Sequence, residues 1–411
     1  MSAVREANRG RLIFLSQLYD PEPTFKGAKF IDALQKSGFD IEVVTGFPNY
    51  PGGHVYDGYK IRPITREVLK NTQVTRLAIY PSHDRNALKR MLCYFSFFLS
   101  SFLFLTFRAK KADVIYVSYP SLTAGLAALG AKLFRRTPIL LDVQDMWPDS
   151  LRATGMVNNR IFIKFIGWLC RLLYRHVDRI IVQSPGLHDL LLERGVPSHK
   201  ISVMYNWADE SEISPVAMVP RGFDPTDRLR VLFAGNIGAA QGLETVINAA
   251  RIIVQRRQDI VFYFLGGGVA LAGLKAMASD LKTVRFLPRV PLQDVQNYLG
   301  AVDCLLVHLN ASELFKKTIP SKTQAYMYAG KPIIMAVEGN AADLILRSDA
   351  GLTCHSENPQ ALANTVFMMD DLGPKRRSMM GQNGRSFYDR ELSLGKNVYA
   401  IGALIDVMIK R

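Results

Sequence analysis

Several sequence features that define large classes of protein are missing from this chain of 411 residues. Its four cysteines are scattered with no CxxC pair, which excludes a disulfide framework and a zinc ribbon and fits a reducing compartment. No P-loop, HExxH or GxSxG motif occurs, so P-loop nucleotidases, zinc proteases and nucleophile-elbow hydrolases are disfavoured. The first residues run into an apolar strand without a signal-peptide core, and we therefore expect no secretion.

The glycine pattern also argues against a nicotinamide-dependent dehydrogenase. The loop after the first predicted strand holds a single glycine, Gly27, and the run Gly266–Gly268 lacks the third glycine of a GxGxxG fingerprint. Glycine (30 residues) and proline (20 residues) are near ordinary usage and form no repeating tract, which excludes collagen-like and low-complexity architectures. The 48% hydrophobic content is that of a packed protein, and the length suggests two or three domains.

Positive charge is in excess and is concentrated in the first half of the chain. The formal net charge is +15. Met1–Ala208 carries 28 Lys and Arg against 16 Asp and Glu, whereas the remainder carries 23 against 20. Such asymmetry indicates an anionic partner for the first half, either a nucleic acid or an anionic membrane surface.

An uncharged run of seventeen residues, Met91–Phe107, distinguishes between these two partners. Basic residues bracket this apolar run, whereas nucleic-acid grooves alternate basic and aromatic residues, so nucleic acid is disfavoured. The run is at the lower limit for crossing a hydrocarbon core of ~30 Å and leads directly into a buried strand. A buried core helix, a helix on the bilayer surface and a transmembrane span all stay open.

We expect the surface-docked arrangement. In it, aromatic side chains enter the bilayer while basic flanks meet anionic headgroups. The residues expected to contact the membrane are Phe97, Phe98, Phe102, Arg90, Arg108 and Lys111.

Apolar, β-branched runs alternate with helix-length segments throughout, which predicts parallel sheets covered by helices on both faces. A proline- and charge-rich stretch at 209–228 separates two halves of this pattern. We therefore expect two doubly wound α/β domains facing each other across a cleft, with a last helix at Val398–Lys410. The predicted strands are Leu12–Ser16, Ile41–Thr45, Val74–Tyr80, Val114–Ser118, Ile139–Val143, Arg179–Val182, Ile201–Met204, Val231–Ala234, Val261–Leu265, Val284–Leu287, Cys304–Val307, Ile333–Ala336 and Gly351–Thr353.

Two loops of the second half are suited to phosphate. Gly235, Gly238 and Gly242 follow a strand and open a helix, where backbone amides can approach an anion, although an ordinary glycine-rich turn has the same pattern. Ser321 and Lys322 stand just before another helix. A capping hydroxyl, a cation and free amides would combine there into a diphosphate site, unless Lys322 is only a solvated surface lysine.

In the first half, Asp145 and Trp147 follow the strand Ile139–Val143. Asp145 could act as a base or accept a hydrogen bond from a sugar hydroxyl; the alternative is an aspartate that caps a helix beginning near Pro148. The aromatic loop that contains Asn49 and Tyr50 could stack on a sugar ring or be a packed surface loop.

Six segments, in this order, resemble the bacterial surface-polysaccharide branch of glycosyltransferase family 4. They are TGFPNYPGG, DVIYVSYPSLTAGLAA, LLDVQDMWPDS, NWADE, VLFAGNIGAAQGLE and TIPSKTQAYMYAGKPIIMA. The resemblance covers nearly the whole chain. It implies the GT-B fold, with the acceptor held by residues 1–208, the nucleotide sugar by 209–394, and a C-terminal helix in 395–411 that crosses back to the first domain.

The resemblance also implies the roles of individual residues. Lys322 and Asp145 become the candidate catalytic residues, and Asn49, Tyr50, Asp145 and Trp147 the acceptor site. The implied donor site consists of Gly27, Gly235, Asn236, Gly238, Gly267, Val290, Ser321, Lys322 and Gln324, with Gly27 facing the diphosphate.

This chain departs from the family pattern at several of these positions. Asn236 and Gln241 stand where the wider family often has an Arg and a Lys, which moves the phosphate charge to Lys322, assisted by Lys316 or Lys317. Gln324 replaces the glutamate that holds the donor ribose, and a neutral amide forms a weaker bond than a carboxylate.

The activity implied is the retaining transfer of a sugar from a nucleoside-diphosphate donor, UDP above others, without a cofactor or bound metal. The implied acceptor is a polyprenyl-diphosphate-linked glycan at the cytoplasmic face of the inner membrane. Two alternatives stay open: a nucleotide-sugar epimerase of similar fold, and a non-catalytic member that binds the membrane or a partner enzyme.

Overall fold

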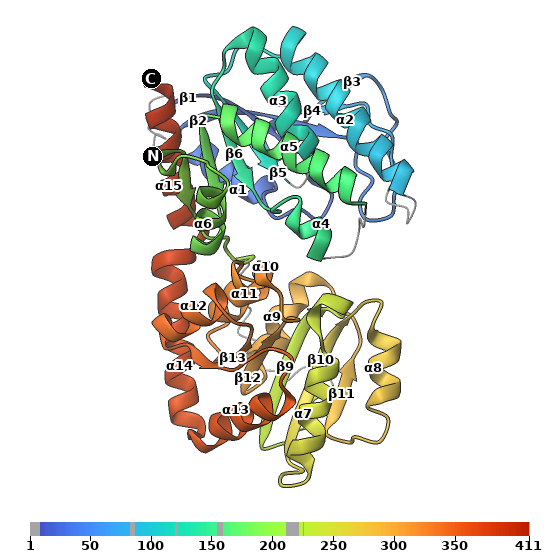
Figure 1. Ribbon diagram of the computed structural model, residues 1–411, viewed down its shortest axis with the longest axis vertical. Helices are drawn as coiled ribbons and strands as arrows, with labels where there is room; N and C mark the ends of the chain where they lie inside the picture. Colours follow the sequence, from blue (N-terminus) through green and yellow to red (C-terminus); the bar gives the residue numbers. More distant parts are fainter. Residues whose placement is uncertain are drawn as a thin grey trace. The chain divides into compact units, whose positions relative to one another are not determined.

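The computed structural model describes residues 9–82, 87–119, 122–153, 159–210, 222–224 and 226–410 (Figure 1). The chain divides into two compact units, each built around one sheet. The first unit comprises Met1–Gln183, Leu187–Met204 and Asn397–Arg411, and the second comprises Ser184–Gly186 and Tyr205–Lys396. Most of the expected linker, 211–221 and residue 225, lies outside the described residues.

The sheet of the first unit has eight strands in the order β3-β4-β2-β1-β5-β6-β7-β8, and all neighbours are parallel except β3 and β4. Its helices cover both faces, as the continuous apolar strands predicted. The strands are β1 (Gly10–Leu15), β2 (Phe39–Gly46), β3 (Ile64–Leu69), β4 (Thr72–Leu77), β5 (Val114–Tyr119), β6 (Ile139–Val143), β7 (Arg179–Val182) and β8 (Ile201–Val203). The helices are α1 (Ala28–Lys36), α2 (Ala87–Phe107), α3 (Leu122–Arg135), α4 (Asp149–Ala153), α5 (Arg160–His176), α6 (Pro185–Glu193) and, at the end of the chain, α15 (Leu394–Ile409).

The second unit repeats this plan with six parallel strands in the order β11-β10-β9-β12-β13-β14. The strands are β9 (Leu229–Asn236), β10 (Ile260–Gly267), β11 (Val284–Leu287), β12 (Cys304–His308), β13 (Ile333–Ala336) and β14 (Gly351–Thr353). The helices are α7 (Glu244–Val254), α8 (Leu271–Met277), α9 (Leu292–Gly300), α10 (Glu313–Lys316), α11 (Ser321–Tyr328), α12 (Asn340–Ser348), α13 (Pro359–Asp371) and α14 (Gly373–Phe387). The two doubly wound sheets expected from the sequence are thus confirmed.

The strand order reverses beside the first strand of each sheet, between β1 and β5 and between β9 and β12. Ligands of such sheets bind beyond the carboxyl ends of the strands near this point. The loops after β1, β6, β9 and β10 are therefore the places where the fold itself positions a site.

One strand was not predicted. β3 pairs antiparallel with β4 through a two-residue turn at Lys70 and Asn71, both with positive φ, of +48° and +68°. Two left-handed residues in a two-residue turn match the twist of a β-hairpin. The strand escaped notice because it lies at the sheet edge, where its side chains alternate between exposed and half-buried instead of forming an apolar run.

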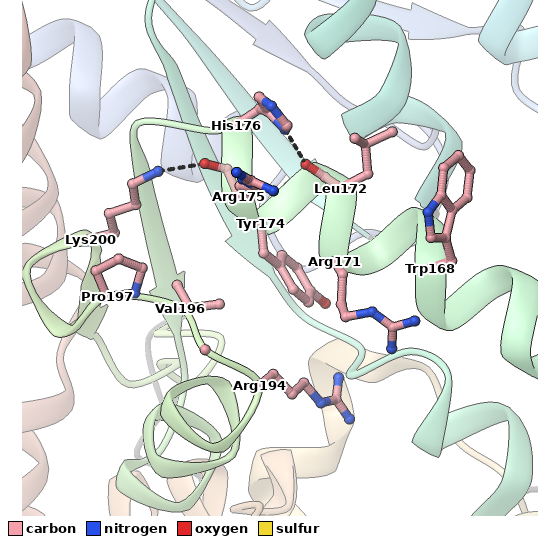
Figure 2. Close-up of a pocket in the computed structure, with 11 residues that line it drawn as sticks. Trp168, Arg171, Leu172, Tyr174, Arg175, His176, Arg194, Val196, Pro197 and Lys200 are labelled. Atoms are coloured by element: carbon pink, nitrogen blue, oxygen red, sulfur yellow. Dashed lines mark hydrogen bonds between the residues drawn. The ribbon is translucent and has the colours of Figure 1, made fainter.

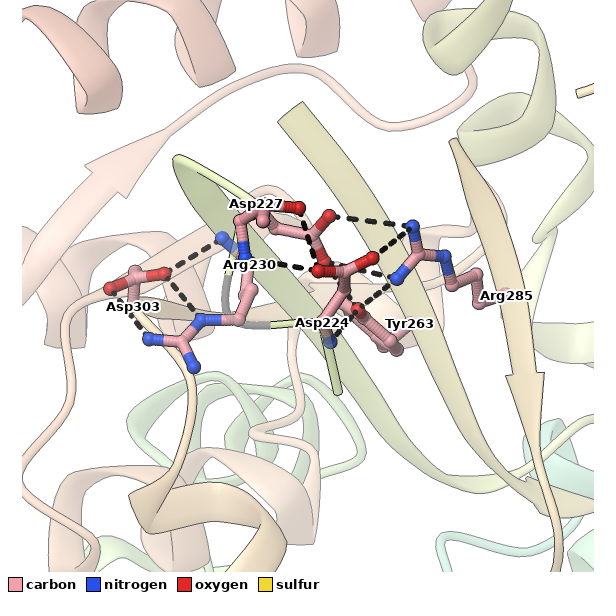
Figure 3. Close-up of polar contacts among 7 residues, drawn as sticks. Asp224, Asp227, Arg230, Tyr263, Arg285 and Asp303 are labelled. Carbon is pink, nitrogen blue, oxygen red and sulfur yellow. Dashed lines mark hydrogen bonds and ion pairs between the residues drawn. The ribbon is translucent and has the colours of Figure 1, made fainter. Parts of the chain in front are cut away.

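An ion-pair network anchors the chain where it enters the sheet of the second unit (Figure 3). Arg285 on β11 pairs with Asp227 at 3.2 Å and donates to the Tyr263 hydroxyl at 2.8 Å, and that hydroxyl also contacts the Asp227 carboxylate. Burial and this carboxylate raise the pKa of Tyr263. Beside it, Arg230 binds Asp303 through its side chain at 3.0 Å and its backbone amide at 2.8 Å, which joins β9 to the start of β12. The network therefore fixes the amino ends of the strands, opposite the loops that form the site.

The end of the chain returns to the first unit. Ile401, Ile405 and Met408 of α15 are buried, and Asp406 pairs with Arg9. The Arg9 guanidinium also lies 4.5 Å from the ring centre of Phe39. The C-terminal helix therefore belongs to the unit formed by the N-terminal half of the chain.

Two helical stretches, Leu88–Phe107 and Gly373–Ile409, are long and apolar enough to cross a membrane by length and composition, and 33% and 39% of their most apolar windows are buried. The second stretch runs through α14, a short π-helix (Tyr388–Leu392) and α15. Within it, α15 packs on the first unit, and Tyr388 and Leu392 are fully buried.

Candidate functional site

A pocket of about 430 Å³ lies at the carboxyl ends of the strands of the second unit. Its floor is made by the ends of β9 and β10, and the first turn of α11 closes one side. Two cations, Arg289 and Lys322, line it, and none of its described lining residues is an aspartate or glutamate. Leu265, Val290, Val295 and Leu299 give it an apolar wall. Cations at one side and an apolar wall at the other suit a ligand with an anionic group and a flat ring.

Lys322 occupies the polar side of this pocket. Its ammonium lies 4.7 Å from the ring centre of Phe233, and no ion pair to it occurs among the described residues. Burial without a counter-charge lowers the pKa of Lys322 to about 8. On the same helix, the Tyr326 hydroxyl accepts a hydrogen bond from the Ala234 amide at 2.9 Å, which holds the end of β9 against α11. The pocket therefore contains a cation that an anionic ligand could neutralise.

Glycine is required at two points of the pocket floor. A Cβ at Gly235, whose φ is +134°, would lie 2.6 Å from Cε of Lys322, so a side chain there would displace the lysine. A Cβ at Gly266 would lie 2.0 Å from the carbonyl oxygen of Gly235. The two glycines let the β9 and β10 loops and Lys322 approach one another closely.

The glycine-rich loop after β9 has fewer free backbone amides than we expected. The Ile237 amide donates to the Gly267 carbonyl at 2.8 Å, and the Gly238 amide donates to the Gln241 side chain at 3.0 Å. Gly238 does not line the pocket, whereas Gly235, Asn236 and Gly267 do. The expected run of phosphate-binding amides at 235–238 is thus largely used within the loop itself.

The start of α11 lies one residue later than expected. Ser321 is the first helical residue, Pro320 precedes it, and no side chain caps the helix. Ser321 is exposed and lines the pocket beside Lys322. The first amides of a helix have no intrahelical acceptor, so those of Ser321 and Lys322 remain available to an anion. The expectation that the Ser321 hydroxyl caps the helix is wrong, because proline holds the cap position.

The structure places two further predicted residues outside the pocket. Gln324 is fully buried, and its amide, oriented to satisfy its hydrogen bonds, donates to the carbonyls of Pro320 and Ser321 at 3.0 and 3.1 Å. Gln324 thereby stabilises the first turn of α11 and does not face the pocket. Lys316 pairs with Glu313 at 2.8 Å on α10. The second cation of the pocket is Arg289, which has no sequence signal apart from its place in the loop after β11.

In the first unit, the predicted acceptor residues Asn49 and Tyr50 are held by a residue that sequence reasoning missed. The buried carboxylate of Glu22 accepts hydrogen bonds from their two amides at 2.7 and 2.8 Å. Burial raises the pKa of Glu22. Asn49 is itself buried and donates to the Phe47 carbonyl at 2.9 Å, so its side chain supports the loop. Tyr50 is only half-buried and lies nearer the surface.

Asp145 lies after β6 with an exposed side chain. Atoms packed around its carboxyl raise its pKa by desolvation. Tyr94 of α2 meets Trp147 edge to face, with ring centres 6.2 Å apart. Tyr94 also lies close enough to Tyr50 and Asp145 for their charges to act on its own pKa, which burial raises. The structure therefore places Trp147 against Tyr94, a residue that the sequence did not single out, and the Trp147 amide donates to the Asp145 carbonyl at 3.0 Å.

A buried polar cluster lies beneath these loops. Asp142, at the end of β6, contacts both the Lys26 ammonium and the Tyr116 hydroxyl through one carboxylate oxygen. Its other oxygen accepts from Gln144 at 2.6 Å and Gln183 at 3.2 Å. Burial lowers the pKa of Lys26 and raises that of Tyr116. Asp142 thereby connects the loops that follow β1, β6 and β7.

Gly27 belongs to the first unit and is not among the residues that line the pocket of the second unit. The carboxylate of Asp20 accepts a hydrogen bond from the next amide, that of Ala28, at 2.7 Å. A Cβ on Gly27 would lie 2.2 Å from this carboxylate. An anion thus already sits at the start of α1, where the resemblance implied that Gly27 would face a diphosphate.

The residues expected to contact a membrane divide into two groups. Phe97 is fully buried in the core of the first unit, so its expected role is wrong. Phe98 and Phe102 are half-buried and stack at 6.2 Å, while Arg90, Arg108 and Lys111 are half-buried or exposed. The exposed side chains of α2 form another stripe, at three- and four-residue spacing: Leu88, Leu92, Phe95, Leu99, Leu103 and Phe107.

Within the described ranges, no three His, Cys, Asp or Glu side chains gather in a way that could hold a metal ion.

Comparison with known families and proteins adds the following. Residues 28–207 match the model "Glycosyl transferase 4-like domain", and residues 220–387 match "Glycosyl transferases group 1". WbjE of Pseudomonas aeruginosa, named as a glycosyltransferase, is 28% identical over 354 residues, which covers 79% of this chain and 84% of that protein. WcaI of Escherichia coli K12, named for colanic acid biosynthesis, is 28% identical over 341 residues, covering 79% and 80%.

Solved structures share the fold at lower identity. Sucrose-phosphate synthase of Thermosynechococcus elongatus superposes with a TM-score of 0.71 at 16% identity, covering 97% of this chain and 99% of that one. HepE of Anabaena in complex with UDP superposes with a TM-score of 0.61 at 14% identity, covering 97% and 100%. The two sheets together therefore form the GT-B fold.

Proposed function

The chain belongs to glycosyltransferase family 4, and from this premise we propose that it transfers a sugar from a UDP-sugar to a polyprenyl-diphosphate-linked glycan in the synthesis of a bacterial surface polysaccharide. The observation that carries the proposal is the pocket of the second unit, where Lys322 and Arg289 stand with the first amides of α11 and no carboxylate lines the described wall. A nucleoside diphosphate matches this pocket, because it carries an anionic diphosphate at one end and a flat base at the other.

Two relatives support the finer parts of the proposal. HepE, which shares the fold, is described in complex with UDP, and this favours UDP over other nucleotides. WcaI is named for colanic acid biosynthesis, and this favours a surface polysaccharide as the product.

The chemistry follows from where charge develops. The bond between the anomeric carbon and the diphosphate oxygen breaks, and its electron pair goes to the diphosphate. The acceptor oxygen bonds to the anomeric carbon on the same face, and its proton passes to the departing diphosphate. Lys322, Arg289 and the amides of Ser321 and Lys322 are in place before the reaction begins and would stabilise this negative charge as it develops.

The first unit would hold the acceptor. Asp145, with Tyr50, Tyr94 and Trp147 around it, offers a hydrogen-bond acceptor beside aromatic rings, which suits a sugar hydroxyl on a sugar face. Asp145 would orient the hydroxyl that attacks. The cluster under Asp142 would keep this loop in place.

We also propose that the enzyme works at the cytoplasmic face of the inner membrane. The exposed stripe of α2 supports this, because Phe95, at 59% exposure, and its apolar neighbours face solvent on a helix whose ends carry Arg90 and Arg108. Tyr94 of the same helix contacts Trp147, one of the residues proposed to hold the acceptor. A lipid-linked acceptor would thus reach Asp145 from the surface on which α2 lies.

Calorimetric titration with UDP, GDP, ADP and dTDP tests the donor assignment. We expect UDP to bind wild type and Lys316→Met, a lysine of the same unit outside the pocket, and not to bind Lys322→Met. Binding of another nucleotide would change the donor, and binding of none would contradict the proposal. Incubating UDP-sugars with and without a polyprenyl-diphosphate sugar tests the transfer, since interconversion without acceptor would indicate an epimerase.

A further inference from the structure

A second cavity, of about 590 Å³, lies in the first unit along the C-terminal half of α5 (Figure 2). None of the residues that line it belongs to the proposed donor or acceptor site. Its polar lining is basic: Arg171, Arg175 and His176 come from α5, and Arg194 and Lys200 from the segment after α6. No aspartate or glutamate is among the described residues that line it.

Two of these cations, Arg171 and Arg175, form no ion pair with another described residue. Arg194 contacts the Asp149 carboxylate and donates to the Trp147 carbonyl at 3.1 Å, so its charge is compensated. Lys200 donates to the backbone carbonyls of Arg175 and Val177 at 2.7 and 2.9 Å, which are neutral acceptors. The guanidinium groups of Arg171 and Arg175 are exposed and have no ion-pair partner in the part of the chain that the structure describes. The cavity thus presents uncompensated positive charge to an anion.

The same helix carries an exposed aromatic face next to this cavity. Phe165 and Trp168 are 53% and 52% exposed, and their rings stack at 6.1 Å. Ile161, one turn earlier, is 80% exposed. Trp168 also lines the cavity, at the edge seen in Figure 2. Trp and Phe beside Arg are the residues that amphipathic helices place at a membrane interface.

The helix α5 belongs to the same layer of helices as α2. In the first unit α3 packs against both α2 and α5, so the three helices form one layer. Phe134 of α3 is 65% exposed and its ring meets those of Phe102 and Phe107 at 6.3 and 6.5 Å. The layer therefore offers apolar side chains on all three helices, with the basic cavity on its α5 side.

We propose that this cavity binds the phosphate of an anionic phospholipid, with Phe165 and Trp168 inserted at the bilayer surface, so that α2, α3 and α5 dock together. We assign a phospholipid to the cavity because of its positive charge and the exposed aromatic residues beside it. An acidic soluble ligand would not require those aromatic residues. This inference rests on the membrane association proposed above and extends it from one helix to a three-helix surface with a headgroup site.

Vesicle co-sedimentation of the full-length protein tests it, using phosphatidylcholine vesicles with and without phosphatidylglycerol. We expect phosphatidylglycerol to strengthen wild-type binding. Arg171→Gln/Arg175→Gln should lose about tenfold or more of this binding, because each basic residue at an anionic surface contributes a factor of about five. Arg62→Gln/Arg66→Gln, which removes the same charge at the opposite edge of the same sheet, should stay within about twofold of wild type.

Fluorescence quenching tests whether Trp168 enters the bilayer. Brominated lipids should quench the fluorescence of wild type more than that of Trp168→Phe, since bromine quenches only indoles that it contacts. Equal quenching in the two proteins would overturn the insertion of Trp168.

The outcomes separate this inference from the proposed function. If Arg171→Gln/Arg175→Gln binds phosphatidylglycerol vesicles like wild type, the headgroup site is refuted while docking by α2 stands. If wild type binds no vesicle, both fail. If the two substitutions abolish the binding of inorganic phosphate but leave the binding of phosphatidylglycerol vesicles unchanged, the cavity serves a soluble anion and the lipid assignment is refuted. Binding of an acidic protein at the same arginines, with no vesicle binding, would refute it too.

Discussion

At the scale of single residues, the pocket of the second unit that we propose binds the donor contains a lysine whose burial is unfavourable. Lys322 is largely buried, has no carboxylate partner among the described residues, and has its pKa lowered to about 8. The free energy lost by desolvating this charge is recovered only when an anion arrives. A cation that reduces stability and faces a pocket is a candidate for binding an anionic ligand.

Replacing Lys322 with methionine should therefore separate binding from stability. We expect the ligand-free variant to melt at the same temperature as wild type or higher, because an unpaired buried charge has been removed. The rise in melting temperature caused by UDP should disappear. Thermal shift with and without UDP measures both, and Lys316→Met should keep the UDP effect. A ligand-free variant that melts much lower would show that Lys322 is structural.

The same lysine predicts a pH dependence of donor binding. Lys322 is charged below a pH of about 8 and neutral above it, whereas a diphosphate stays ionised across this range. UDP should therefore bind up to about tenfold more weakly at pH 9 than at pH 7. Titration calorimetry across this range in wild type would measure the change, and an affinity that is flat or rises with pH would contradict the assignment.

The Lys26–Asp142 pair makes the opposite prediction, since both charges are compensated within the protein. Lys26→Met leaves the Asp142 carboxylate buried beside Tyr116 and should cost about 3–5 kcal/mol of unfolding free energy. Lys26→Met/Asp142→Asn should recover part of that loss, because no charge is then left unpaired. Urea unfolding of the two variants and wild type would test this, and equal stability of all three would exclude the pair as a structural contact.

At the scale of elements, α2 shows how one apolar sequence serves two purposes. Phe97, Phe104 and Leu105 pack into the core, while Phe95, Leu99 and Leu103 face outward. The run Met91–Phe107 is apolar on both sides, so its composition alone does not reveal which side is buried. Contacts with α3 and the sheet settle that question.

The two sides of α2 should respond differently to the same change. Phe95→Ser/Leu99→Ser should release the protein from membranes with little effect on melting temperature. Phe97→Ser should lower the unfolding free energy by about 3–5 kcal/mol, because it leaves a cavity and buries a hydroxyl. Cell fractionation and thermal melting distinguish the two. Unchanged membrane association of the outward variant would contradict docking by α2.

At the scale of the whole molecule, the first unit contains both the N-terminal half of the chain and its C-terminal helix. Residues 397–411 complete the first unit, where Ile401, Ile405 and Met408 are buried. The N-terminal half of the sequence is therefore not a complete folding unit by itself.

Removal of residues 397–411 should destabilise the protein strongly. Each buried apolar side chain of α15 contributes about 2 kcal/mol, so the first unit should lose about 5 kcal/mol or more. Asp406→Asn, which only weakens a partly exposed ion pair with Arg9, should lose less than about 1 kcal/mol. Comparison of chemical unfolding in the two variants provides the measurement, and a truncated chain as stable as wild type would contradict the packing.

The sequence by itself determined the class of fold and the family. Apolar runs at regular spacing are set by local chemistry, so the parallel strands could be predicted, and short motifs such as SKTQAYMYAGKP carry the family signature. It also pointed to Lys322, because a lysine next to Ser321 at the start of a helix combines a cation with free backbone amides. The hairpin strand β3 was missed, since an edge strand needs no apolar run.

Only the tertiary structure decided which groups face one another. It showed that Gln324 binds the carbonyls at the start of α11, that Arg289 lines the pocket, and that Glu22 and Tyr94 contact Asn49 and Trp147. It also separated the buried Phe97 from the exposed Phe95. The physical reason is that hydrogen-bond partners and burial depend on residues brought together from distant parts of the chain, whereas periodicity and turn chemistry depend on neighbours in sequence.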